Sequence, residues 1–210
     1  NQWTGILATS PELQTGGTRG IVFGEQSNTS DIEFYNIDTA GNAADFADMT
    51  RSSTVSAAAF ASRVRGIASG GGSPSPTNII EFITFAIQNN AQDFGDLTRA
   101  HRNAGGGSSE TRGLTIGGYV APNTVNTIDY VTIASLGNSA DFGDLNETSR
   151  AIGAASDCRR AVFAHGDSPS YSGSIDYVNI ATTGNGIDFG NSSQNRRGSA
   201  GCSNAHGGLG

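Results

Sequence analysis

The sequence contains no lysine, because all 12 of its Lys and Arg residues are arginine. Chemistry that needs a lysine, such as P-loop phosphate binding, Schiff-base catalysis or the phosphate contact of a protein kinase, is therefore excluded. The tripeptide Asp-Phe-Gly, which holds magnesium in kinases, occurs at 93–95, 141–143 and 188–190. Because the kinase lysine is missing, we interpret these three tripeptides as parts of a repeat.

Positive charge and long apolar runs are also scarce. The arginines are outnumbered by 19 acidic residues, the net charge is -7 and no basic stripe is visible, so we expect no nucleic-acid partner. No stretch approaches the roughly 18 apolar residues that span a bilayer, and no basic-then-apolar signal segment opens the chain, so we expect no membrane insertion. The chain starts at Asn1 rather than methionine, and we expect it to be processed or to be part of a longer product.

Cysteine and histidine occur only a few times. Cys158 and Cys202 occupy non-equivalent places in the repeat described below, and we expect small buried or half-buried residues rather than a disulfide. His101, His165 and His206 also fall at different places in the repeat, which predicts surface or loop positions. No Gly-x-Ser-x-Gly motif or recognisable pairing of histidine with a nucleophile is present, so the sequence predicts a protein that is not an enzyme.

Glycine, in contrast, is abundant, with 30 of 210 residues, and it punctuates a repeat of about 48 residues. Each copy has an Ile-acidic-aromatic triplet, then a Gly-Asn or Asn-Asn pair, then an Asp-Phe pair. The triplets lie at 32–34, 80–82, 128–130 and 175–177, so their aromatic residues are 48, 48 and 47 positions apart. Such spacing indicates a repeat architecture, in which each unit buries its faces against its neighbours.

The unit at 112–159 shows the strand pattern most clearly. Strands are predicted at 112–118, at 127–134, where both faces are largely apolar, and at 141–145. The small-residue run 151–156 is expected to open the next unit, and the alanine-rich stretch 55–61 is expected to be the equivalent strand despite its helix propensity. Four short antiparallel strands per unit, joined by glycine turns, predict an all-β fold, a β-propeller of four-stranded blades. A parallel β-helix is the alternative.

The whole chain is expected to form a single repeat domain, residues 1–210. The four full units are placed at about 19–64, 65–111, 112–159 and 160–206. Residues 1–18 and 193–210 carry strand-like material outside a complete unit. We expect these terminal segments either to pair and close the ring or to belong to a partial fifth unit.

The unit resembles a compact kelch-type propeller repeat. The residues that carry the resemblance are the glycine-ended strand Arg112-Gly113 to Gly117-Gly118, the acidic-aromatic pair Asp129-Tyr130, the following aromatic strand and the next arginine. The sequence of 127–145 is similar to kelch-like repeats of tail and other virion proteins of bacteriophages, notably those of cyanobacteria. The resemblance covers about residues 19–210, and it implies a kelch-like blade and a structural role in a virion.

Charged residues recur once per unit. The recurring arginines are Arg19, Arg65, Arg112 and Arg160, and the recurring aspartates are Asp45, Asp93, Asp141 and Asp188. They could form a charged ring around a channel that binds an ion, but we favour arginines bonded to carbonyls or carboxylates between blades and aspartates that cap turns. The oxygen-rich loop of a calcium site is missing, so we expect no metal and no cofactor.

Sequence variation is concentrated at one place in the unit. The segments 25–30, 72–77, 119–126 and 167–173 differ in length and composition, and they are expected to be loops on one face of the ring. Loops on a rigid scaffold often bind ligands, although simple drift is the alternative. The candidate ligand-binding residues are Tyr119, Asn123, Asn126, Ser170 and Tyr171.

Two functions remain open from the sequence. We expect a non-enzymatic structural and adhesion module of a virion, in a phage tail or fibre or otherwise extracellular. Such a module would form homo-oligomers, contact other virion proteins or bind a host-surface glycan through the loop face. The alternative is a free carbohydrate-binding lectin-type β-propeller.

Overall fold

The described part of the chain is built of strands. The structure is a computed structural model that describes residues 17–24, 30–51, 56–72, 75–168 and 170–203. These residues are all-β, with 59% of them in strands and no helix among them. Accordingly, the described residues contain no helix long and apolar enough to cross a membrane.

Four antiparallel sheets follow one another along the chain. Sheet 1 consists of β1 (Arg19–Phe23), β2 (Asp31–Asn36) and β3 (Ala44–Asp48). Sheet 2 consists of β4 (Ala58–Ala61), β5 (Arg65–Ser69), β6 (Thr77–Thr84) and β7 (Gln92–His101). Sheet 3 consists of β8 (Gly105–Ser108), β9 (Arg112–Val120), β10 (Asn123–Thr132) and β11 (Ala140–Asp144). Sheet 4 consists of β12 (Gly153–Ser156), β13 (Arg160–Ala164), β14 (Asp167–Ser168), β15 (Ser170–Asn179) and β16 (Ile187–Arg196).

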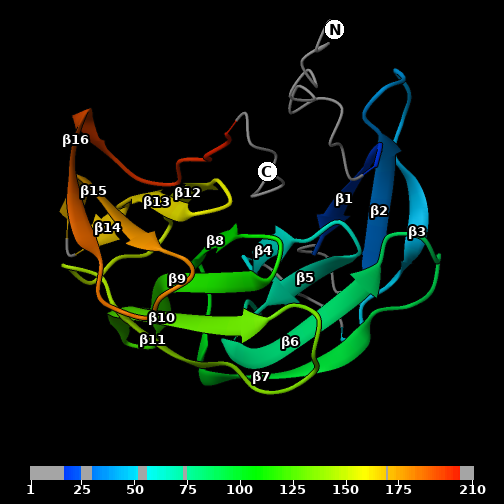
Figure 1. The fold of residues 1–210 in the computed structure, drawn as a ribbon, viewed down its shortest axis with the longest axis horizontal. Helices are drawn as coiled ribbons and strands as arrows, with labels where there is room; N and C mark the ends of the chain where they lie inside the picture. The colour runs from blue at the N-terminus through cyan, green and yellow to red at the C-terminus, as the bar shows by residue number, and fades with distance from the viewer. Residues whose placement is uncertain (1–16, 25–29, 52–55, 73–74, 169, 204–210) are drawn as a thin grey trace, which may run out of the picture.

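The sheets are arranged along an open arc (Figure 1). Sheet 1 stands at one end and sheet 4 at the other, and β4, β8 and β12 lie on the inner side, where β8 contacts both β4 and β12. Sheets 2 and 3 run from innermost to outermost strand in chain order. All ladders between the described strands are antiparallel, which rules out the parallel β-helix.

The innermost strands confirm two predictions from the repeat. The stretch 55–61 contains β4 in its described part, and 151–156 contains β12, so the repeat register prevails over alanine's helix propensity. Each of these strands hydrogen-bonds to the arginine-led strand that follows it. Sheets 2, 3 and 4 therefore begin before the recurring arginine, whereas the described part of sheet 1 begins at Arg19.

An aromatic pair holds the two outer strands of each sheet together. The aromatic residue of the triplet meets the phenylalanine of the Asp-Phe pair edge to face, with ring centroids 6.0, 5.9, 5.8 and 6.1 Å apart in sheets 1 to 4. Such a pair contributes roughly 0.5–1.5 kcal/mol beyond burial alone. The recurring arginine stacks over the triplet ring, as in Arg65 over Phe82 and Arg112 over Tyr130. These contacts explain why the three motif positions repeat together.

The hydrophobic core is divided among the interfaces between successive sheets. Ile128, on one face of β10, clusters with Val178 of sheet 4. On the other face, Val131 and Ile133 cluster with residues of sheet 2. The prediction that the central strand is covered on both sides is therefore confirmed, and each sheet depends on its neighbours for burial.

The glycine of Asp-Phe-Gly marks a close approach between neighbouring sheets. Gly143 has φ +147°, a backbone conformation that favours glycine, and an added Cβ would lie 2.4 Å from the carbonyl oxygen of Gly184. Gly95 has the same φ, and its Cβ would lie 2.4 Å from the carbonyl oxygen of Gly137. The interpretation of these tripeptides as parts of the repeat is thus confirmed.

The variable segments are largely hairpins, so the prediction of open loops is wrong where the structure describes them. Segment 119–126 consists of the ends of β9 and β10 around a two-residue turn at 121–122, and Tyr119 pairs with Thr124. Segment 167–173 contains β14 and the start of β15. Most of 25–30 and part of 72–77 lie outside the described residues. The hairpins form because pairing continues the ladders beyond the sheet and satisfies backbone groups that an open loop would leave to water.

Candidate functional site

A cavity of about 310 Å³ lies between the innermost segments of the arc. Its walls come from β4, β8, β12 and residues 201–203, and they consist of Ala, Gly and Ser with one phenylalanine and one cysteine. None of the lining residues is charged, so the alternative of a ring of recurring arginines and aspartates around a channel is not found in the described structure. The wall offers neutral hydroxyl and backbone groups.

Serine hydrogen bonds link the innermost segments around this cavity. The hydroxyl of Ser108 donates to the carbonyl of Ala61 at 2.9 Å, and the backbone N–H of Ser108 donates to Ser156 Oγ at 3.1 Å. Ser203 Oγ donates to the carbonyl of Ser156 at 2.6 Å. These residues occupy one repeat position. The tail at 201–203 therefore lies beside β12, at the repeat position of an innermost strand.

A buried carboxylate joins each pair of neighbouring sheets. Glu81, Asp129 and Asp176 occupy one position of the triplet, and all three are buried. Each accepts the backbone N–H of one residue at the end of the preceding sheet's outer strand, from Thr50, Thr98 and Asn146 respectively. The side chain of a second residue also donates to each carboxylate. This second donor differs from one interface to the next: Arg51, Ser139 and His165. We call this contact the carboxylate clasp.

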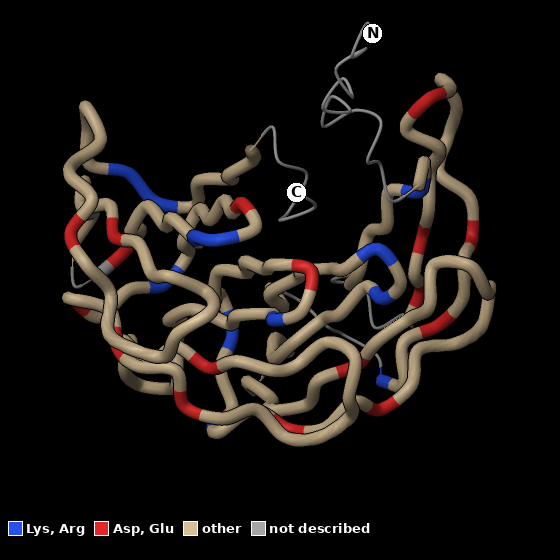
Figure 2. Tube along the Cα trace, in the orientation of Figure 1, with Lys and Arg blue, Asp and Glu red and all other residues tan. Residues whose placement is uncertain are grey.

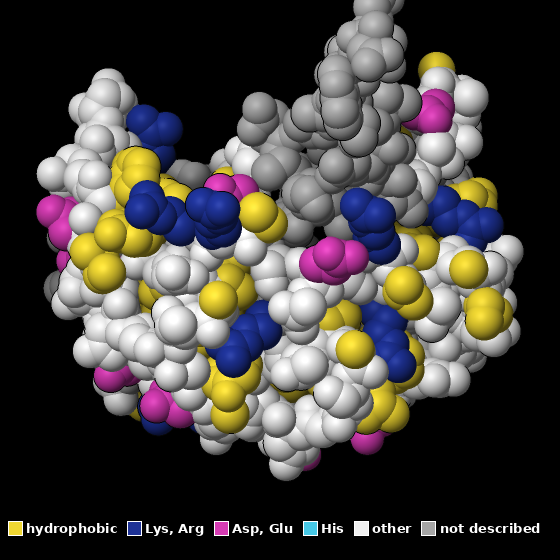
Figure 3. All heavy atoms as spheres, viewed as in Figure 1, with side chains coloured by type: hydrophobic (Ala, Val, Ile, Leu, Met, Phe, Trp, Pro, Cys, Tyr) yellow, Lys and Arg dark blue, Asp and Glu magenta, His cyan; other side chains and the backbone are white. Residues whose placement is uncertain are grey.

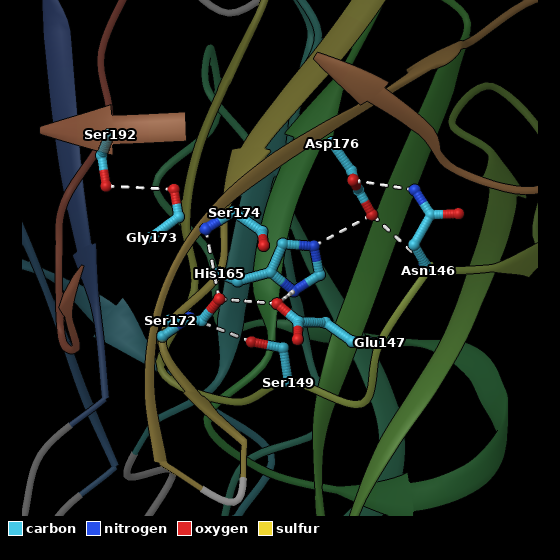
Figure 4. Close-up of polar contacts among 10 residues, drawn as sticks. Asn146, Glu147, Ser149, His165, Ser172, Gly173, Ser174, Asp176 and Ser192 are labelled. Atoms are coloured by element: carbon cyan, nitrogen blue, oxygen red, sulfur yellow. Dashed lines mark hydrogen bonds and ion pairs between the residues drawn. The ribbon is translucent and has the colours of Figure 1, made fainter. Parts of the chain in front are cut away.

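The version of the clasp between sheets 3 and 4 is rich in groups used in catalysis (Figure 4). His165 Nε2 lies 3.0 Å from Asp176 Oδ2, and His165 Nδ1 lies 3.6 Å from Glu147 Oε1. Ser172 Oγ donates to Glu147 Oε1 at 2.6 Å. Histidine takes the repeat position held by Gly70 in sheet 2, and this places the imidazole beside the clasp.

The geometry of this cluster is structural. Burial alone would raise the pKa of Asp176, but hydrogen bonds from His165 and Asn146 outweigh it and hold the pKa below the usual aspartate value. The hydroxyl of Ser172 donates to Glu147 rather than to the imidazole, so the nucleophile-to-base hydrogen bond of a serine hydrolase is absent from the cluster. His165 is 1% exposed, which leaves the ring no open side for a substrate.

Two predictions about sparse residues are wrong. His101 and His165 are buried rather than at the surface, although His165 does lie in the link between β13 and β14. His165 bonds to Asp176 within sheet 4, whereas His101 bonds across the interface between sheets 2 and 3. His101 Nδ1 lies 2.7 Å from the carbonyl oxygen of Gly117, and burial lowers the pKa of His101. His206 lies outside the described residues. Cys158 and Cys202 are both exposed free thiols rather than buried or half-buried, because both belong to segments outside the apolar interfaces.

Three of the four recurring arginines, Arg19, Arg65 and Arg112, bridge neighbouring sheets, as predicted, whereas Arg160 is exposed at the end of the arc. Arg65 Nη1 donates to the carbonyl of Ile133 at 2.7 Å, and Arg112 Nη1 donates to the carbonyl of Ile180 at 3.1 Å. In Figure 3 arginine side chains lie next to hydrophobic ones at several places along the arc, and no histidine is visible on that face. In Figure 2 acidic residues are spread along the rim of the arc, whereas most arginines lie nearer its middle.

The recurring aspartates are exposed residues at the start of the outer strands. Asp188 Oδ1 accepts the backbone N–H of Gly190 at 3.0 Å within β16, so this bond lies inside a strand and does not cap a turn. The described residues hold no group of three or more His, Cys, Asp or Glu side chains placed to bind a metal ion.

A row of arginine and tyrosine side chains runs along the hairpins of sheets 3 and 4. The guanidinium groups of Arg102 and Arg150 lie over the ring of Tyr119, at 5.5 and 5.0 Å from its centroid. Arg150 also donates to Asp167 Oδ2 through Nε at 3.0 Å and through Nη2 at 2.7 Å. The row is therefore anchored to sheet 4 through a charge-assisted bond.

The row continues to an exposed aromatic residue. Arg197 Nη1 lies 3.9 Å from Asp167 Oδ2, and its guanidinium lies 5.1 Å from the ring centroid of Tyr171. Tyr171 is 50% exposed and the side chain of Arg197 is 57% exposed. We call Arg102, Tyr119, Arg150, Asp167, Arg197 and Tyr171 the hairpin row.

The structure brings together two of the five candidate ligand-binding residues, Tyr119 and Tyr171, as members of the hairpin row. Asn123 is exposed at the β9–β10 turn, and Ser170 is exposed at the start of β15. Asn126 is half-buried, and its carbonyl accepts the N–H of Leu145 at 2.7 Å, so its backbone has a structural role. The sequence analysis did not identify Arg150, Asp167 and Arg197 as site residues. Arg150 and Arg197 occupy equivalent positions in the repeat, and this equivalence is the signal that could have identified them.

Comparison with known proteins gave no match to a protein-family model and none to a curated protein.

Proposed function

We propose that the four sheets are blades of a kelch-like β-propeller. Three features support this arrangement: sheets 2, 3 and 4 run outward from an innermost strand, every pair of neighbouring sheets packs face to face, and the innermost segments of sheets 2, 3 and 4 share one cavity. The resemblance of the repeat to kelch-like virion proteins points the same way.

On this scaffold we propose a non-enzymatic adhesion module that binds a surface carbohydrate through the hairpin row. The observation that carries the proposal is the exposed Tyr171 ring beside the Arg197 guanidinium. A flat aromatic face stacks on the apolar face of a sugar, and arginine and carboxylate groups donate to and accept from its hydroxyls. Because the bonds between Asp167 and Arg150 fix the centre of the hairpin row, the side chains of the row are preorganised for a ligand.

We propose a non-enzymatic protein because the most enzyme-like polar cluster has a structural role between sheets. The His165 cluster is the most enzyme-like group in the described chain, and it is one version of a clasp that recurs without histidine at the other two interfaces. A carboxylate that recurs at one repeat position, while its second donor residue changes from interface to interface, is typical of a structural contact.

Glycan binding tests the adhesion role. The protein is screened on an array of bacterial and host-surface glycans, and hits are measured by titration calorimetry. Tyr171→Ala and Arg197→Ala are each expected to weaken binding by about tenfold or more. Leu136→Ala removes a similarly exposed side chain from the β10–β11 turn and should leave affinity unchanged. Absence of any glycan hit, or equal effects of all three substitutions, would refute the carbohydrate site.

The setting of the module is a separate question. The resemblance to virion repeats supports a place in a phage tail or fibre, whereas a free lectin would carry the same hairpin row. Recovery of the chain within purified particles favours the virion role, and recovery as a free glycan-retaining protein favours the lectin.

A further inference from the structure

The interfaces between neighbouring sheets are built from one set of contacts. Between sheets 2 and 3, these include the clasp of Thr98 on Asp129 and the bond from the N–H of Asp96 to Asn138 Oδ1 at 3.0 Å. The N–H of Ser139 returns a bond to the carbonyl of Asp96 at 2.8 Å. The same amide contact recurs between sheets 3 and 4, where the N–H of Asp144 donates to Asn185 Oδ1 at 3.1 Å.

Each interface also has an arginine that donates to a carbonyl of the next sheet. In addition, a phenylalanine packs against the next sheet. Phe46, Phe94 and Phe142, the phenylalanines of the Asp-Phe pairs, are 1%, 3% and 2% exposed in sheets 1, 2 and 3. Each forms a cluster with apolar residues of the following sheet. One side of a sheet therefore supplies donors and a phenylalanine, and the opposite side of the next sheet supplies acceptors and aliphatic residues.

The side of sheet 1 that no other described sheet covers carries the acceptor set. Glu33 stands at the clasp position and Asn42 at the amide position, and both are exposed. Tyr35 and Ile37, at the positions of the buried Val131 and Ile133, are 43% and 64% exposed. We call these four residues the acceptor face.

The side of sheet 4 that no other described sheet covers carries the donor set. Ser193 stands at the position of Thr98, Asn191 at that of Asp96 and Arg160 at that of Arg112, and all three are exposed. Phe189 is 55% exposed, although the equivalent phenylalanines are buried. Gly190, unlike Gly95 and Gly143, has nothing within 4 Å of its Cβ position. We call Arg160, Phe189, Asn191 and Ser193 the donor face.

We propose that the donor face of one copy of this chain binds the acceptor face of a second copy. Every internal contact then has its counterpart: Ser193 clasps Glu33, Asn191 bonds to Asn42, and Arg160 reaches the carbonyl of Ile37. Phe189 covers Tyr35 and Ile37. A second copy is the fitting occupant because the match is set residue by residue by the repeat, and because the acidic Glu33 and the basic Arg160 lie on opposite faces.

This association joins two different surfaces, so it is heterologous. Heterologous contacts continue from copy to copy until the rotation closes a ring, or else form an open filament. The chain would therefore extend its own architecture across molecules with no new type of contact.

Two substitutions, each on one face, test the proposal. Sedimentation velocity of the full chain over a range of concentrations should show association that Tyr35→Asp or Phe189→Asp abolishes. A mixture of the two variants retains one intact face on each partner, so it should form a dimer and nothing larger. Thermal unfolding of each variant checks that it remains folded.

Leu136→Asp is the matched control, because Leu136 is 58% exposed and lies on neither face. It should associate like the wild type. A wild-type chain that stays monomeric up to about 1 mM overturns the proposal, and so does a variant mixture that forms no dimer or continues to larger species. Glycan titration of the monomeric variants separates this result from the hairpin row, whose binding should be retained.

Discussion

The carboxylate of Asp129 accepts the backbone N–H of Thr98 at 2.9 Å and the hydroxyl of Thr98 at 2.8 Å, across the interface between sheets 2 and 3. Glu33 occupies the same repeat position in sheet 1 but is exposed. The chain therefore contains a buried and an exposed version of one contact. Their comparison isolates the contribution of the clasp to stability.

Removal of the buried carboxylate should be costly. Asp129→Ala leaves the donors of Thr98 and Ser139 without their acceptor, and we expect a loss of about 2–4 kcal/mol in the free energy of unfolding. Glu33→Ala should change it by less than about 0.5 kcal/mol. Urea unfolding at low protein concentration measures both values. Equal losses would mean that the clasp contributes nothing specific.

The glycine of the Asp-Phe-Gly tripeptide should be required only where another sheet covers it. Gly143→Ala places a Cβ 2.4 Å from the Gly184 carbonyl, whereas Gly190→Ala meets open space at a similar positive φ. Both substitutions introduce backbone strain of about 1–3 kcal/mol, and the first adds overpacking of about 1–3 kcal/mol. We expect Gly143→Ala to lower the melting temperature more than Gly190→Ala, and the reverse order would contradict the packing described.

Burial of His101 should make the protein less stable as the pH falls. Its pKa is lowered in the folded state, so the unfolded chain binds more protons below the ordinary histidine value of about 6.5. The free energy of unfolding should therefore decrease from about pH 7 towards pH 5. His101→Gln removes the titrating group and should reduce this slope. Urea midpoints across the pH range give the comparison, and identical slopes would contradict the assignment.

The two cysteines should react as exposed thiols. Cys158 and Cys202 are unpaired and exposed, so a thiol reagent such as DTNB should modify two groups per folded chain without denaturant. Cys158→Ser should reduce the native reaction to one group. If denaturant is needed before either thiol reacts, the exposure described here is wrong.

Much of the sheet architecture follows from the sequence. The run 127–134 around the triplet has apolar residues on both faces, which predicts a strand covered on both sides, and the structure places neighbouring sheets on each face. The Gly-Asn turns and Asp-Phe pairs mark the outer strands in the same way. A repeat makes such predictions reliable because each copy repeats the same local signal.

Two parts of the site could not be read from the sequence. Nothing in the sequence around His165 indicates that this histidine is buried. Its burial depends on Asp176, which lies on a neighbouring strand and whose carboxylate needs a hydrogen-bond donor. The ladders at 119–126 and 167–173 depend on cross-strand pairing, which proline and glycine in the segment conceal. In both cases a tertiary partner overrides the local pattern.

The division of the core among separate interfaces has a consequence for how the protein tolerates change. Because each sheet is secured only to its immediate neighbours, the energetic effect of a substitution stays close to where it is made. The hairpins that carry the row of arginine and tyrosine residues are joined to each other through Arg150 and Asp167. A new recognition surface would therefore be grafted onto this pair of hairpins together, with the more distant part of the arc serving as an unaltered frame.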